Sequence, residues 1–261
     1  MRPAIDTTKP SPARMYDYFL GGKDNYQVDR DAAQIVLKDA PEAKDVAVVN
    51  RRFLKRATWY ATKNRGVRQF LDLGSGLPTQ ENVHEVAQAD APNACVVYVD
   101  NDPSVLLHSK GLIVNNDRTG YVQADIRTPA EIITSPVTQR LIDFNNPVAV
   151  MLVSVLHFIP DADDPYGIVK DLMDQVPSGS LLILSHVTTD NISPVVAERI
   201  QQQQLAVPLN LRSGMDIQRF FHGLDLVDPG CVFLEQWAPG EILPVDETAP
   251  LKLRCGVAVK P

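Results

Sequence analysis

Three acidic residues lie at or near the ends of three short apolar runs, beside a turn with two glycines. Asp72 is in the first run, Gln69–Leu73, directly before the turn Gly74–Gly76. Asp100 ends the second run, and Asp125 follows the third. The carboxyl ends of parallel strands share one edge of a sheet, where ligands bind in open α/β folds. Glycines let a ligand approach the backbone, and buried acids need a partner. The combination therefore indicates a site for a positively charged nucleoside.

Each acid suits a different part of such a ligand. Asp72 suits an ammonium group, and Asp100 could hold both hydroxyl groups of a ribose. Asp125 could accept a hydrogen bond from an adenine amino group, with the amide of Ile126 against the ring. A nicotinamide-dependent oxidoreductase is an alternative, but the dinucleotide fingerprint requires a third glycine where this chain has Thr79.

The elements that must position these acids alternate along the chain. Five apolar runs are separated by segments of helical length, which predicts βαβ units and a doubly wound, mostly parallel sheet. Prolines that follow Asp102, Thr128 and Asp164 predict helix starts. Two consecutive apolar runs near the end predict an antiparallel hairpin at one sheet edge. The expected strands are Gln69–Leu73, Cys95–Asp100, Gly120–Ala124, Val148–Leu156, Ser180–Ser185, Gly230–Trp237 and Lys252–Val259.

The N-terminal quarter of the chain has a different pattern. We expect a flexible arm over residues 1–12, because three prolines disfavour regular structure there. A helical cap is expected over residues 13–65, most clearly from Glu42 to Asn64, and the α/β domain over 66–261. The loop with Gly22 and Tyr26, together with Tyr18, could form a lid that binds the cofactor. The alternative is a plain connection between two packed helices.

Composition excludes several other classes. The 261 residues have a net charge of −7, which disfavours nucleic acid as a partner. Three dispersed cysteines indicate reduced thiols and a cytoplasmic location. The longest apolar stretch, Val148–Ile159, is too short for a membrane span, and we see no signal peptide. The acidic run Asp161–Asp164 lacks the spacing of a calcium loop, so no metal site is expected.

The motifs DLGSG, YVDND and QADIR resemble those of class I S-adenosylmethionine-dependent methyltransferases. The segments ARMYDYFLGGKDNY, NRRFLKRA, FLDLGSGLPTQENVHEVA and VSVLHFIPDADDP further resemble the little-characterised methyltransferase 19 family. The resemblance implies a seven-stranded Rossmann-like sheet that ends in the antiparallel hairpin. It implies S-adenosyl-L-methionine as cofactor and transfer of its methyl group. Pro78 departs from the common class I pattern but matches the narrower family.

The resemblance also implies roles for individual residues. Gly74, Ser75 and Gly76 would flank the methionine part of the cofactor, with Asp72 near its amino group. Ser154 would line the floor under the sulfonium. The ribose would be held by Asp100 with Asn101 beside it, and the adenine by Asp125 and Ile126.

The catalytic step leaves alternatives open. His157, which follows the fourth expected strand, is the candidate general base or a wall of the acceptor pocket; it could also be a histidine bonded to local backbone. A small-molecule methyl acceptor is favoured, with no nucleic acid or membrane partner. The alternative function is a non-catalytic module that binds S-adenosylmethionine for regulation or partner binding.

Overall fold

The computed structural model describes residues 5–78, 81–113, 116–190, 192, 198, 208–238 and 252–261. Its centre is a mixed sheet of eight strands in the order β3-β2-β1-β4-β5-β8-β6, with β7 also paired to β8. The strands are β1 Gln69–Leu73, β2 Cys95–Asp100, β3 Thr119–Gln123, β4 Ala149–Val153, β5 Leu181–Thr188, β6 Asp225–Leu226, β7 Val232–Phe233 and β8 Lys252–Val259. The first five strands are parallel, and β8 runs antiparallel to β5. This confirms the predicted fold class, with the seventh position shared by two short strands.

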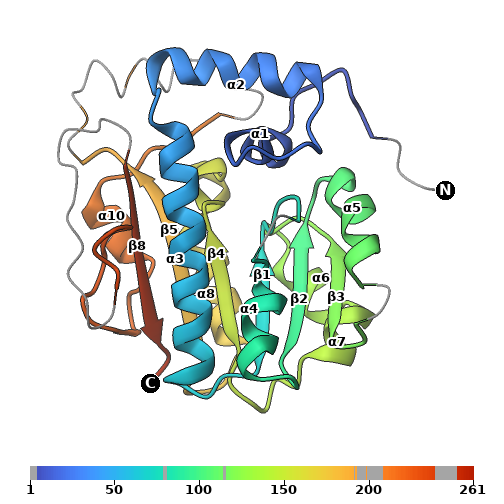
Figure 1. The fold of residues 1–261 in the computed structure, drawn as a ribbon. Coiled ribbons are helices and arrows are strands. Elements are labelled where there is room, and N and C mark those ends of the chain that lie inside the picture. The colour runs from blue at the N-terminus through green and yellow to red at the C-terminus, as the bar shows by residue number, and fades with distance from the viewer. Residues whose placement is uncertain are drawn as a thin grey trace.

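Helices cover both faces of the sheet, and two lie over its carboxyl edge (Figure 1). In Figure 1, α3 and α4 lie in front of the sheet, α6 and α8 lie behind it, and α1 and α2 lie above the strand tips. The helices are α1 Pro12–Phe19, α2 Gln27–Asp39, α3 Ala43–Lys63, α4 Val83–Asp90, α5 Pro103–Ile113, α6 Pro129–Thr134, α7 Pro136–Leu141, α8 Pro165–Asp174 and α10 Gly214–Arg219, with 3-10 turns at Leu156–Phe158 and Asp161–Asp163. The predicted proline starts of α5, α6 and α8 are confirmed.

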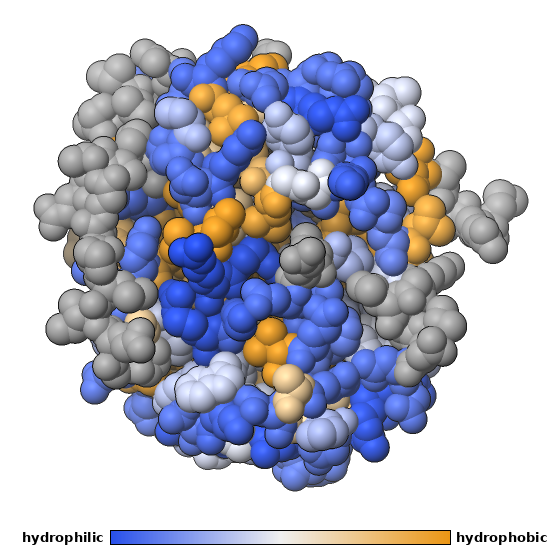
Figure 2. Space-filling view, in the orientation of Figure 1, coloured by the Kyte–Doolittle hydropathy of each residue, from blue (hydrophilic) through white to orange (hydrophobic). Residues whose placement is uncertain are grey.

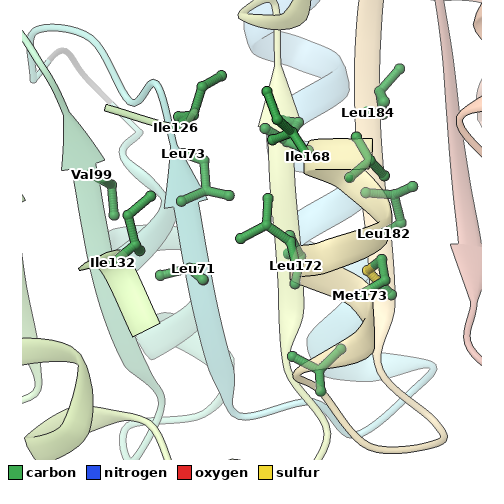
Figure 3. Close-up of a cluster of buried hydrophobic side chains, with 14 of the residues drawn as sticks. Leu71, Leu73, Val99, Ile126, Ile132, Ile168, Leu172, Met173, Leu182 and Leu184 are labelled. Carbon is green, nitrogen blue, oxygen red and sulfur yellow. The ribbon is translucent and has the colours of Figure 1, made fainter. Parts of the chain in front are cut away.

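The sheet separates two apolar cores, as expected for strands that are buried on both faces. Leu71 and Leu73 of β1 point to one side, where they join side chains from α8 and β5 (Figure 3). Phe70 points to the other side and packs in the cluster with Phe53 and Ala57 of α3. The two cores fix the strands, and hence fix where their carboxyl ends lie.

The face covered by α3 and α4 is mostly hydrophilic, and its apolar areas are separated from one another (Figure 2). Within the described parts of the chain, no helix is long and apolar enough to cross a membrane.

One predicted strand is much shorter than expected. Only Val232–Phe233 of the segment Gly230–Trp237 pairs with β8. Trp237 is fully buried, with its ring edge-on to Phe53 of α3 at 5.4 Å between centroids. The Arg56 guanidinium donates to the carbonyl oxygens of Leu234 and Trp237 at 2.8 and 2.9 Å. These contacts with α3 draw the chain away from the sheet edge.

A buried ion pair joins α1 to α2 in the cap. The Arg14 Nε atom lies 2.8 Å from a carboxylate oxygen of Asp29, and both side chains are almost fully buried. Asp29 also accepts from the backbone amides of Ser11 and Tyr26, at 2.9 and 2.8 Å. Arg14 further donates to the carbonyl oxygen of Lys9 at 2.6 Å. The described part of the expected arm, residues 5–11, is therefore bonded to α1 and α2.

Candidate active site

The turn after β1 can be built only with glycine at its first position. Gly74 has a φ of +69°, and a Cβ there would lie 2.3 Å from Cγ2 of Val155. Gly76 also has a positive φ, of +66°. The amides of Gly74 and Ser75 donate to the carbonyl oxygen of Val99 at 2.8 and 3.1 Å. The turn therefore lies between the end of β2 and the segment after β4, with its backbone open to close approach.

Asp100, at the tip of β2, is bonded into this turn. One carboxylate oxygen accepts from the amide of Gly76 at 2.8 Å, and the other accepts from the amide of Asp102 at 2.9 Å. The side chain is buried, and burial raises its pKa to about 6 against the opposing effect of these bonds. Because a carboxylate oxygen has two acceptor sites, each oxygen can accept one further hydrogen bond.

Asp72, on the neighbouring strand, has a different environment. It is 4% exposed, and among the described residues none donates a hydrogen bond to its carboxylate. Burial raises its pKa to about 7, partly offset by the positive charge of Arg51. The carboxylate faces a cavity of about 20 Å³ that it lines with Arg51, Asn82, His84 and Tyr98. A buried acid without a donor is costly unless a cation binds it.

Asp125 and Ile126 lie just after the end of β3. Both oxygens of Asp125 accept from Arg127, with the Nη2 contact at 2.6 Å, and this bonding lowers the pKa of the carboxyl group. The Ile126 side chain is buried in the core behind the sheet. Asn101 is exposed beside them. Asp125 is thus held as a carboxylate at the predicted position, with a cation already bound.

Ser154, at the tip of β4, has an unusual backbone conformation for a residue with a side chain, with a φ of +57°. Its amide donates to both the carbonyl and the hydroxyl oxygen of Ser185, at 3.1 and 3.0 Å. Such conformations persist where the surroundings fix them, and they are often found at functional sites. Since the next residue, Val155, packs on Gly74, Ser154 lies beside the glycine turn.

Sequence comparison identifies the family. A family model described as S-adenosyl methyltransferase matches residues 1–261. The chain belongs to the S-adenosyl methyltransferase family. It is therefore an enzyme that transfers the methyl group of S-adenosylmethionine to an acceptor, with a Rossmann-like fold. The non-catalytic module and the oxidoreductase considered from the sequence are set aside.

Two solved structures are similar to this methyltransferase over almost its whole length. A DUF574 family protein from Streptomyces avermitilis is 38% identical, with a TM-score of 0.91, and the match covers 99% of this chain and 100% of that one. A protein from Thermobifida fusca YX assigned to the methyltransferases is also 38% identical, with a TM-score of 0.90 and coverage of 99% and 97%.

A more distant structure shows the same fold. The N-methyltransferase NodS from Bradyrhizobium japonicum, in complex with S-adenosylhomocysteine, is 10% identical, with a TM-score of 0.51 and coverage of 95% and 99%. No curated protein matches the chain.

The methyltransferase places His157 in a buried cluster behind the strand tips. The side chain is 5% exposed, and burial together with nearby His186 and Arg212 holds its pKa well below the usual value. Arg212 donates to Nε2 of His186 at 2.7 Å, and the two histidine rings lie 5.5 Å apart. The imidazole of His157 is therefore neutral at pH 7, and it does not line the cavity at Asp72.

The predicted lid residues of the methyltransferase make contacts within the cap. The Tyr18 hydroxyl accepts from Nε2 of Gln34 at 2.6 Å. Gly22 packs closely on the Asp17 carboxylate, where a Cβ would lie 1.9 Å from one oxygen. Tyr26 lies under the guanidinium of Arg14, 5.3 Å from its ring centroid. None of these three residues lines the cavity at Asp72, as far as the structure describes it.

The loop between α1 and α2 nevertheless reaches the sheet domain. Asp24 lies 3.6 Å from Nδ1 of His108 on α5. At the start of α1, the Ser11 hydroxyl donates to the carboxylate of Asp102, which follows β2. The cap therefore meets the sheet domain at α5 and at the segment that follows β2.

Two of the residues that line this cavity, Arg51 and His84, are not among the site residues predicted from the sequence. In the sequence, Arg51 belongs to a basic cluster typical of a solvated helix face, and His84 falls in an expected helix as a surface or packing residue. In the structure Arg51 is half-buried beside Asp72, and His84 is buried, with Nδ1 2.8 Å from the Tyr98 hydroxyl. Only the packing of α3 and α4 on the sheet brings them together, and helical periodicity does not report that.

The remaining predictions concern metals and the acceptor. Asp161 pairs with Arg212, Asp163 pairs with Arg127, and Asp164 accepts from the amide of Gly167 as the N-cap of α8. In the described residues, no group of three or more His, Cys, Asp or Glu could hold a metal ion. The segment Ile192–Leu211, which the sequence suggests as a wall of the acceptor pocket, lies mostly outside the described residues, as does Thr79.

Proposed function

We propose that this methyltransferase acts on a small-molecule acceptor and binds its cofactor at the tips of β1, β2 and β3. The observation that supports the site best is the buried carboxylate of Asp72, which faces a cavity and accepts no hydrogen bond from the described residues. S-adenosylmethionine carries an ammonium group that fits this carboxylate. The residues present therefore fit the cofactor that the family uses.

In this proposal the methionine end of the cofactor lies between α3 and the glycine turn. Asp72 binds its ammonium group. Arg51 lines the same cavity and binds its carboxylate, because a guanidinium matches carboxylate geometry. The backbone of Gly74–Gly76 flanks the chain between these groups and the sulfur.

The nucleoside end lies along the neighbouring tips. Asp100 accepts from the ribose hydroxyls through the acceptor sites that the backbone leaves open, with Asn101 beside it. Asp125 and the amide of Ile126 contact the adenine, and Asp125 then shares its carboxylate with Arg127. Ser154 lines the floor under the sulfonium.

For the chemistry, S-adenosylmethionine supplies a methyl group that is already activated by a positive sulfur. The protein then has to align a nucleophile with that methyl group and exclude water. His157 is the candidate base, since its neutral ring has the free lone pair that a base needs. Its low pKa makes it a weak base, so alignment and water exclusion account for most of the rate.

The cap, over residues 13–65, acts in this proposal as the lid of a domain that spans residues 66–261, with residues 1–12 as its arm. A volume of about 20 Å³ holds one water molecule and no nucleoside. Entry of the cofactor therefore requires the covering elements to move, and Tyr18, Gly22 and Tyr26 move with them and close on the cofactor. The three free cysteines, Cys95, Cys231 and Cys255, support a cytoplasmic location.

The acceptor class is tested with S-adenosylmethionine that carries a radioactive methyl group. The protein is incubated with this cofactor and an extract of cells, which is then separated into small molecules, proteins and nucleic acids. We expect label among the small molecules with the wild-type protein and none with Asp72→Asn. Label that appears only in protein or nucleic acid would contradict the proposed acceptor class.

A further inference from the structure

A chain of hydrogen bonds connects the cap to the tip of β4. The Tyr16 hydroxyl on α1 accepts from Nδ2 of Asn50 on α3 at 2.9 Å. Oδ1 of Asn50 accepts from the Ser185 hydroxyl on β5 at 2.7 Å. The Ser185 oxygen accepts from the amide of Ser154 at 3.0 Å. This series of hydrogen bonds joins α1, α3, β5 and the tip of β4, which are separated in the sequence.

The direction of every bond in this chain is fixed by its neighbours. Tyr16 donates its proton to the carbonyl oxygen of Ala47 at 3.1 Å, so that its oxygen can only accept from Asn50. The Asn50 amide is thereby oriented with its oxygen toward Ser185. Ser185 has one proton, which it donates to Asn50, so its lone pairs are left for Ser154. Removal of the Tyr16 oxygen removes the group that orients the rest.

The two central residues of this series of hydrogen bonds are shielded from water. Asn50 is 2% exposed and Ser185 is fully buried. Asn50 precedes Phe53 and Ala57 on α3, and Ser185 follows Ile183 on the fully buried strand β5. Phe53, Ala57 and Ile183 belong to one apolar cluster. An asparagine and a serine are costly in such a place unless they are fully bonded. Packing alone does not explain them, since apolar residues would pack there at no such cost.

The series of hydrogen bonds ends at Ser154, whose backbone conformation is unfavourable unless its surroundings fix it. Ser154 has its φ of +57° at the tip of β4, and both described bonds from its amide go to Ser185. Val155, directly after it, packs on Gly74. A change in the conformation of Ser154 therefore moves the contact with the turn that flanks the methionine part of the proposed site.

We propose that Tyr16, Asn50 and Ser185 are positioning residues for methyl transfer, through which α1 holds Ser154 in its left-handed conformation beside the reacting methyl group. The proposal rests on the cofactor site proposed above. None of the three residues touches the cofactor in it. They act through Ser154, so their loss changes the environment of the methyl group more than it changes the affinity.

The test uses the full-length protein and S-adenosylmethionine labelled with carbon-13 in the methyl group, whose resonance reports that environment without an acceptor. Tyr16→Phe removes one oxygen from the cap, and Ser185→Ala removes the central hydroxyl. We expect both to shift the resonance of the bound methyl group by more than its linewidth. The affinity for S-adenosylhomocysteine, measured by calorimetry, is expected to change by no more than about threefold. Ser185→Thr, which keeps the hydroxyl, should restore the wild-type resonance.

Two matched controls remove hydroxyl groups that do not belong to this series of hydrogen bonds. Tyr166→Phe removes a hydroxyl on α8 that donates to the carbonyl oxygen of Asp216 at 3.3 Å. Thr58→Val removes a buried hydroxyl on α3 that donates to the carbonyl oxygen of Leu54 at 2.8 Å. Neither should move the resonance.

The outcomes separate this proposal from the one it rests on. A wild-type protein that bound no labelled cofactor would overturn both. A wild-type protein that bound it, with the resonance unmoved in Tyr16→Phe, would overturn the positioning role alone. If Ser185→Ala did not fold, Tyr16→Phe would still decide, because it alters only the cap. A resonance moved equally by the controls would also overturn the proposal.

Discussion

Asp72 and Asp100 are the same residue type near the ends of paired strands, and both are buried, yet the protein treats them differently. The backbone amides of Gly76 and Asp102 bind the Asp100 carboxylate, whereas the described residues donate nothing to Asp72. Accordingly, the pKa is raised to about 6 for Asp100 and to about 7 for Asp72. One acid is bonded into its own turn, and the other is the one that we propose binds the ammonium group. A carboxylate at a strand tip can therefore stabilise the fold, bind a ligand or do both. The hydrogen-bond donors around it distinguish these roles.

The substitution Asp100→Ala should have the largest effect, because this acid serves both purposes. It removes two acceptors for the ribose and leaves two backbone amides without a partner. We expect the affinity for S-adenosylhomocysteine to fall roughly 100-fold or more and the free energy of unfolding to fall by about 1–3 kcal/mol. Calorimetry and denaturant unfolding measure the two quantities. An unchanged affinity would show that the ribose does not bind at Asp100.

The substitution Asp72→Asn should have opposite effects on cofactor binding and on protein stability. It removes the charge that binds the ammonium group, so the affinity should fall roughly 30-fold or more. The free protein should become more stable at pH 8 by about 1–3 kcal/mol, because a buried charge is removed. The gain should shrink as the pH falls from about 7 and vanish near pH 3.8, below which Asp72 is protonated in both the folded and the unfolded wild-type protein. A loss of stability at pH 8 would mean that Asp72 has a partner in the free protein.

The pH dependence of binding should follow Asp72 as well. Folding raises this pKa from 3.8 to about 7, so the native protein takes up a proton that must leave before the ammonium group binds. The affinity should therefore rise with pH and be about tenfold higher at pH 8 than at pH 6. Calorimetry in buffers of different ionisation heat should detect the released proton. The Asp72→Asn protein is the control and should show a nearly flat profile above pH 6.5.

The substitution Asp125→Asn should have the smallest effect of the series. This acid is half-exposed and already paired with Arg127, so it contributes one hydrogen bond in partial competition with solvent. We expect roughly a threefold to tenfold loss of affinity and little change in stability. A loss as large as that of Asp100→Ala would place the main anchor of the nucleoside at the adenine, not at the ribose.

Local sequence patterns predicted the parts of the molecule that depend on local interactions. The bounds of β1 and β2 match the apolar runs, and α3 begins and ends within one residue of the predicted Glu42–Asn64. The glycine turn was predictable because a positive φ and close packing leave glycine as the only choice at Gly74.

The contacts between distant segments could not be predicted in this way. Arg51 has the spacing of an exposed helix residue, and only the tilt of α3 on the sheet brings it to Asp72. Asn50 and Ser185 are separated by 135 positions, and nothing in either segment indicates the other. The shortening of the strand at Gly230–Trp237 has the same origin, because Trp237 packs on α3 from a different part of the chain.

The contacts between the cap and the tip of β2 also bear on how often the enzyme can work. If the cap is the lid that we propose, used cofactor departs only after the contacts of Ser11 and Arg14 with Asp102 have broken. We expect departure of the demethylated nucleoside, rather than the bond exchange itself, to limit turnover, as in other enzymes whose lids open slowly. The demethylated cofactor would then inhibit the enzyme, and this product inhibition would limit its activity.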